Sequence, residues 1–312
     1  MNCKLLRFVM FTLSLLAIPT FVNAQVNGSG PSDSALFDIV INLPPAPDIG
    51  SVQTIGGVTD QTTQLNVMDG GSVVFGFDAQ SGSEVNISGG NVGGCFDAFF
   101  GSEVNISGGT VGGGFDANSG SEVNISGGTV GGGFDAESGS VVTISGGTVS
   151  AAFDAQSGSD VELIGGEFLL NGDPFTGSSI TLVDGDDVFT GTLQDGSAFV
   201  FSPLSIDTLS GVTLTTVALP TLDTTPRVVN TDISAGPSGL RAGQSLTLQD
   251  GGVLGDNFAA VDATLNIEGG VAGPAMETAR STVNISGGEV GFGFEALSGS
   301  CLLYTSPSPR DS

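Results

Sequence analysis

The sequence predicts an all-β protein, a parallel β-solenoid with 19-residue coils that is interrupted by a small β insert. Two observations predict this fold class. Residues 76–166 repeat one motif five times without a gap, and phenylalanine recurs every 19 residues, at Phe77, Phe96, Phe115, Phe134 and Phe153. Each copy also alternates polar and apolar residues, as in SEVNISGG, which is the period of a strand with one buried face. A short fixed period is typical of a stacked array, so we expect each coil to pair with the next about 4.8 Å away.

Residues 1–24 are interpreted as an export signal. Lys4 and Arg7 give a positive start, residues 8–21 are apolar but too few to span a membrane, and Val22-Asn23-Ala24 resembles a cleavage site. A membrane anchor is the alternative. Export predicts an extracellular or cell-surface protein with no membrane span in its mature part.

Four further segments follow in order. Residues 25–64 lack the repeat motif and are expected to form an N-terminal cap, because the terminal units of such arrays are atypical. Residues 65–168, here named array 1, hold the repeats. Residues 169–243 lose the period and are expected to be either a β-rich insert that caps array 1 or a set of irregular wide coils. Residues 244–300, named array 2, regain the period with Leu246, Leu265 and Val283 at 19 and then 18 residues.

The last twelve residues, 301–312, differ from everything before them. CLLYTSPSPRDS holds the only tyrosine of the chain and resembles one translated frame of a sequencing adapter. It is expected to be a non-native tail, with array 2 truncated in mid-repeat before it.

Composition limits the chemistry. The chain has 33 acidic and 6 basic residues and no histidine, and residues 25–300 keep only Arg227, Arg241 and Arg280 as bases. Histidine-based triads, lysine Schiff bases and metal sites built on histidine are therefore excluded from this part, and so strong a negative charge argues against nucleic acid as a partner. Cys95 stands where sister repeats have glycine, and it is expected to lack a disulfide partner.

The most provocative site candidate is a row of aspartates, one per coil. Neighbouring carboxylates at the coil spacing repel by about 1 kcal/mol in water and by about 3.5 kcal/mol at an effective dielectric constant near 20. The row must therefore be solvated or bridged by cations, and Ca²⁺ prefers such oxygen ligands, so calcium is the candidate cofactor. The candidate metal ligands are Asp78, Asp97, Asp116, Asp135 and Asp154.

Two further rows are predicted on the neighbouring strand. Glu84, Glu103, Glu122 and Asp160 form an acidic row that Val141 breaks. The residues two places on form an amide row, in which stacked side chains can hydrogen-bond along the axis. Its members are Asn86, Asn105 and Asn124.

The segment SEVNISGGTVGGGFDANSGSEVNISGG resembles the right-handed β-helix repeats of large secreted or cell-surface proteins of environmental bacteria. The resemblance covers residues 65–168 and 245–300 and implies an extracellular, often adhesin-like scaffold. We therefore expect a non-enzymatic structural or adhesive protein that displays acidic and Asn rows to divalent cations or surface glycans. The alternative is a β-helix enzyme, lyase-like or glycoside hydrolase-like, that degrades polysaccharides. Such an enzyme should interrupt its rows at one cleft with non-repeated carboxylates and a basic residue.

Overall fold

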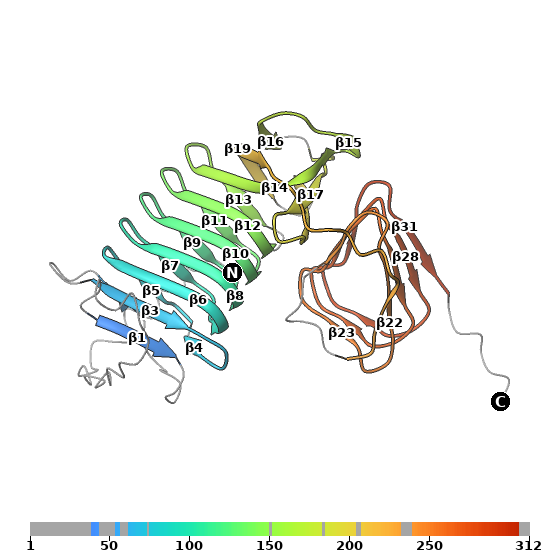
Figure 1. Cartoon of the computed structure of the whole chain (residues 1–312), viewed down its shortest axis with the longest axis horizontal. Coiled ribbons are helices and arrows are strands. Elements are labelled where there is room, and N and C mark those ends of the chain that lie inside the picture. The colour runs from blue at the N-terminus through green and yellow to red at the C-terminus, as the bar shows by residue number, and fades with distance from the viewer. Residues whose placement is uncertain are drawn as a thin grey trace.

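The computed structural model describes residues 39–43, 54–56, 62–73, 75–149, 152–182, 185–203, 207–231 and 239–305. Every regular element in these ranges is a β-strand, and most strand pairs are parallel. The predicted fold class, an all-β parallel solenoid with coils about 19 residues apart, is confirmed (Figure 1). Across these same ranges there is no helix long and apolar enough to cross a membrane. The expected export signal, residues 1–24, lies outside the described residues.

Array 1 stacks its long strands in parallel, each on its equivalent in the next coil. Ile87 pairs with Ile106, and Ile106 with Ile125, so the register follows the repeat of the sequence. The ladder includes two strands from before the regular repeats. Its strands are β1 (Ile39–Leu43), β3 (Thr63–Val67), β6 (Ser83–Val92), β8 (Glu103–Val111), β10 (Glu122–Val130), β12 (Val141–Val149) and β14 (Asp160–Leu170).

A second ladder of short strands forms the opposite wall of each coil. The glycine pair in the middle of β6, β8, β10 and β12 bends the chain toward it. Gly109 has a φ of +73°, and a Cβ there would lie 2.5 Å from the carbonyl oxygen of Gly89, so only glycine fits this bend. The short strands are β2 (Thr54–Ile55), β5 (Asp78–Ala79), β7 (Phe96–Ala98), β9 (Phe115–Ala117), β11 (Phe134–Ala136) and β13 (Phe153–Ala155), and β4 (Ser72–Val73) pairs with β6.

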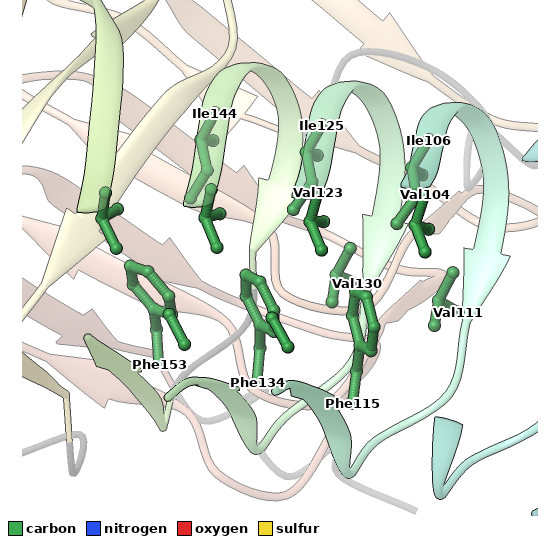
Figure 2. Close-up of a cluster of buried hydrophobic side chains, with 14 of the residues drawn as sticks. Val104, Ile106, Val111, Phe115, Val123, Ile125, Val130, Phe134, Ile144 and Phe153 are labelled. Atoms are coloured by element: carbon green, nitrogen blue, oxygen red, sulfur yellow. The ribbon is translucent and has the colours of Figure 1, made fainter. Parts of the chain in front are cut away.

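The core of array 1 is built from stacked identical side chains (Figure 2). The rings of Phe96, Phe115, Phe134 and Phe153 stack with centroids 4.6 to 5.1 Å apart, and Phe77 continues the series at 5.0 Å. Figure 2 shows this column facing the valine and isoleucine columns of the long strands. The fully buried columns account for the period of the sequence, because each coil covers the apolar face of the one before it.

After β14 the chain leaves the regular coil. The strands β15 (Asp173–Pro174), β16 (Ser179–Leu182), β17 (Phe189–Leu193) and β18 (Ala198–Phe201) are all in antiparallel pairs. Strand β19 (Thr208–Thr216) then returns to lie parallel to β13 and β14. Phe201 places its ring 5.5 Å from that of Phe153, so the β17–β18 hairpin closes the phenylalanine column.

Array 2 repeats the coil design in three sheets of its own. One holds β20 (Arg227–Val229), β22 (Ser245–Leu248), β25 (Thr264–Ile267), β28 (Thr282–Ile285) and β31 (Cys301–Tyr304). The second holds β21 (Gly239–Leu240), β24 (Ala259–Val261), β27 (Glu277–Ala279) and β30 (Glu295–Ala296). The third holds β23 (Val253–Leu254), β26 (Val271–Ala272) and β29 (Glu289–Val290). Within the described ranges, the strand pairings do not join array 2 to array 1.

Two departures from the repeat motif, the segment Cys301–Tyr304 and the residue Cys95, are seen in the structure. Cys301–Tyr304 pairs in register with β28, although all four of its side chains are exposed. Cys95 is disulfide-bonded. The expectation that Cys95 has no partner is therefore wrong.

Candidate functional site

The aspartate row lies on the short strands of array 1, directly after the phenylalanine of each coil. Asp97 pairs in register with Asp78 and Asp116, and Asp135 with Asp116 and Asp154. The alternation of the strand turns each phenylalanine inward and each aspartate outward. The structure thus brings all five predicted ligands into one row along the axis of the array.

The row is only partly open to solvent. Asp116 is 9% exposed, and the other four aspartates are half-buried. Burial also raises the pKa of Asp154 above its usual value, because it disfavours the charged form of the carboxyl. Half-buried carboxylates one coil apart interact more strongly than fully solvated ones, so this row has more need of a counter-charge than the glutamate row.

The amide row is a continuous chain of hydrogen bonds. The Asn124 side-chain amide donates to Asn105 at 3.0 Å, Asn105 donates to Asn86 at 3.1 Å, and Asn86 donates to Asn66 at 3.1 Å. Array 2 repeats the device, since Asn284 donates to Asn266 at 2.7 Å. The prediction that stacked amides bond along the axis is confirmed.

The same amides also hold the glutamate row. Asn86 donates to Glu84 at 2.6 Å, and Asn105 donates to Glu103 at 2.9 Å. Each bond joins residues two apart on one strand, so it fixes the carboxylate beside the amide row. Glu103 and Glu122 are exposed, and Val141 interrupts the row in the next coil with an exposed apolar side chain. In the coils of Glu84 and Glu103, one hydrogen-bond network therefore orients the side chains of both rows.

The arginines lie away from these rows. Arg241 forms an ion pair with Glu167 at 3.2 Å, and Arg280 forms one with Asp262 at 2.7 Å. Arg280 also donates to the hydroxyl of Thr190 at 3.0 Å. Sequence reasoning assigned no role to these two arginines, because their partners are 74, 18 and 90 residues away along the chain.

One buried carboxyl was not predicted. Asp207 is 2% exposed and accepts hydrogen bonds from the backbone N–H groups of Phe153 at 2.9 Å and Ser202 at 2.8 Å. Burial raises the pKa of Asp207 to about 7, although these bonds lower it, and the nearby Glu295 raises it further. Asp207 sits in no repeat, so no periodic signal marked it.

The described residues bring no group of three or more His, Cys, Asp and Glu side chains into an arrangement that could hold a metal ion. Rows differ from such clusters, since a row offers one carboxylate per coil. Calcium at the aspartate row therefore remains a prediction. Comparisons of the chain with family models, with curated proteins and with solved structures found no match.

Proposed function

We propose that the chain is a non-enzymatic scaffold of the cell surface or extracellular space, structural or adhesive, that displays acidic and amide rows to divalent cations or surface glycans. The observation that supports this proposal is the regularity of the rows. Asp, Glu and Asn recur at the same strand positions over successive coils, in register and without a local break in the aspartate row.

The fixed orientation of the row side chains also supports a role in presenting them to a ligand. Asn86 and Asn105 each donate to the neighbouring Asn and to the adjacent Glu, so the two rows keep fixed orientations in these coils. A surface whose side chains are already ordered loses less conformational entropy when it binds a partner. A repeating surface also allows many weak contacts to act together on a repeating ligand such as a glycan chain.

The arginines favour the scaffold over the enzyme alternative. An enzyme acting on acidic polysaccharides needs basic groups that face its substrate, whereas Arg241 and Arg280 each bind a carboxylate of the chain itself. Arg241 is also 6% exposed, which leaves it little surface for a ligand. These two side chains are already neutralised and largely covered.

Thermal unfolding in calcium and in chelator tests the cation part of the proposal. We expect calcium to raise the midpoint, because an ion that binds only the folded chain stabilises it by about 2.7 kcal/mol at a hundred times its dissociation constant. The double variant Asp97→Asn, Asp116→Asn should abolish the rise. Its matched control is Glu103→Gln, Glu122→Gln, which removes two charges from the adjacent coils and should keep the rise.

Each outcome separates two roles of the rows. If the wild-type midpoint does not move with calcium, the aspartate row is a solvation device and the cation part is wrong. If both double variants lose the rise equally, calcium acts on the total charge. Binding of acidic and neutral glycan chains to the immobilised full chain then tests display, and release of shortened sugars from those chains would support the enzyme alternative.

A further inference from the structure

The β17–β18 hairpin is buried on both of its faces. Phe189, Phe199 and Phe201 point into the core of array 1 and close its phenylalanine column. The alternate residues of the same strands point the other way, into a separate apolar cluster with array 2. That cluster consists of Val188, Ala198, Val200, Ala259, Val261, Ala279 and Leu297.

Array 2 meets the hairpin with the outward face of its short strands. Val261 and Ala279, which pair in register on β24 and β27, occupy the position that Asn118 and Glu137 hold in array 1. In array 1 this position is half-buried and mostly polar, whereas Val261, Ala279 and Leu297 at this position in array 2 are buried and apolar. The face that array 1 leaves to solvent is therefore adapted in array 2 for contact with the hairpin.

Two arginines bridge the rim of this contact. Arg241, directly after β21 in the array 2 sheets, pairs with Glu167 on β14, and the Thr192 hydroxyl donates to the same carboxylate at 3.0 Å. Arg280 of array 2 donates to Thr190 on β17 while it pairs with Asp262. Arg280 and Asp262 have φ values of +51°, in the left-handed region where equivalent turns carry Gly243 and Gly299. Residues with a Cβ rarely adopt this conformation, so this ion pair is kept at a conformational cost to the turn.

We propose that the hairpin is a shared cap that fixes the end of array 1 against the side of array 2, so that both arrays move as one rigid unit, locked by Arg241 and Arg280. Separating the hairpin from array 2 would expose apolar surface on both. It would also take Arg241 from Glu167 and Arg280 from Thr190, although both arginines are buried or half-buried.

Small-angle X-ray scattering of the full chain tests the lock. We expect a single end-to-side arrangement to fit the wild-type profile. The double variant Arg241→Gln, Arg280→Gln should show a larger maximum dimension with an unchanged far-UV circular dichroism spectrum. A wild-type profile that needs a range of arrangements would overturn the rigid unit, and a double variant with the wild-type profile would overturn the role of the arginines.

A second pair of variants tests the cap. Val200→Glu places a charge between the hairpin and array 2, and we expect it to enlarge the particle and to split thermal unfolding into two transitions. Val141→Glu makes the same change at an exposed position whose equivalents are Glu103 and Glu122, and it should match the wild type. If Val200→Glu also matches the wild type, the proposal of a shared cap is wrong. If Val200→Glu prevents folding, the scattering profile of the Arg241→Gln, Arg280→Gln variant decides whether the two arrays are locked together.

Discussion

Array 1 and array 2 build the same coil but treat the outward face of its short strands differently. The four residues that begin at the large inward side chain of each coil read FDAQ, FDAF, FDAN, FDAE and FDAQ in array 1, and FAAV, META and FEAL in array 2. The inward residues stay large and apolar or small in both arrays. The outward residues are acidic and polar in array 1, but largely apolar in array 2, where the β17–β18 hairpin covers them. The inward positions thus determine the solenoid, and the outward ones determine what each wall contacts.

Among the substitutions considered, one in the phenylalanine column should lower the free energy of unfolding most. Phe115→Ala should lower the free energy of unfolding by about 3 to 5 kcal/mol, because it removes a fully buried ring from between two stacked neighbours. Phe100→Ser, at an exposed turn whose equivalents are serine, should change it by less than about 0.5 kcal/mol. Urea unfolding measures both. Similar losses from the two variants would contradict the stacked core.

The raised pKa of Asp207 predicts how the stability of the fold depends on pH. Its pKa is raised to about 7 in the folded chain from 3.8, so its contribution to stability is full below about pH 4 and is lost as the pH rises through 7. The shift amounts to about 4 kcal/mol at most. Asp154, whose pKa is also raised, changes in the same direction.

Unfolding in urea at pH 5 and at pH 8 checks this dependence. Asp207→Asn cannot titrate, so it should flatten the difference between the two pH values. Glu295→Gln removes only the neighbouring charge and should reduce the difference slightly. An equally steep dependence in the Asp207→Asn variant would show that other carboxyls cause it.

An exchange of one outward residue tests the comparison between the arrays directly. Ala259→Asp gives array 2 the aspartate of array 1 at a position that is 4% exposed against the hairpin, and it should cost about 3 kcal/mol or more. The reverse exchange, Asp97→Ala, removes a charge from the aspartate row and, measured in chelator, should be neutral or stabilising. Calorimetry of both variants measures the pair. A small loss of stability in Ala259→Asp would mean that the hairpin and array 2 separate easily at this position.

The amide row should have a smaller effect. Asn105→Ala removes the bonds to Asn86 and Glu103 and leaves Asn124 without its acceptor, which should cost about 1 to 3 kcal/mol. Thr143 occupies the same row in wild-type β12, so Asn105→Thr is the milder control. Thermal unfolding ranks the two. Equal midpoints for both variants and the wild type would mean that solvent replaces the row without loss.

Periodicity predicted the parts of the molecule that repeat, and the reason is physical. Each coil places the same residue against its copy in the next coil, so the positions of Phe115, Ile106 and Asn105 follow from the spacing alone. The contact between the β17–β18 hairpin and array 2 could not be predicted in this way. Ala198-Phe199-Val200-Phe201 shows no sign in its sequence that its two faces enter different cores, and Arg280 finds Thr190 only through the tertiary fold. Asp207 likewise gains its raised pKa from residues that folding brings around it.

The smallest prediction concerns one turn position in array 1. Cys95, Gly114, Gly133 and Ala152 occupy it, and all four have φ between +58° and +79°. Glycine adopts this conformation freely, whereas a residue with a Cβ pays about 1 to 2 kcal/mol. Ala152→Gly should therefore raise the free energy of unfolding by about 0.5 to 1 kcal/mol, after the greater freedom of glycine in the unfolded chain is subtracted. Gly133→Ala, the converse change, should lower it by a similar amount, and a Cβ there meets nothing closer than 3.6 Å, so the effect isolates the backbone. Opposite signs in urea unfolding support left-handed strain at this turn, and equal signs would place the cost in packing.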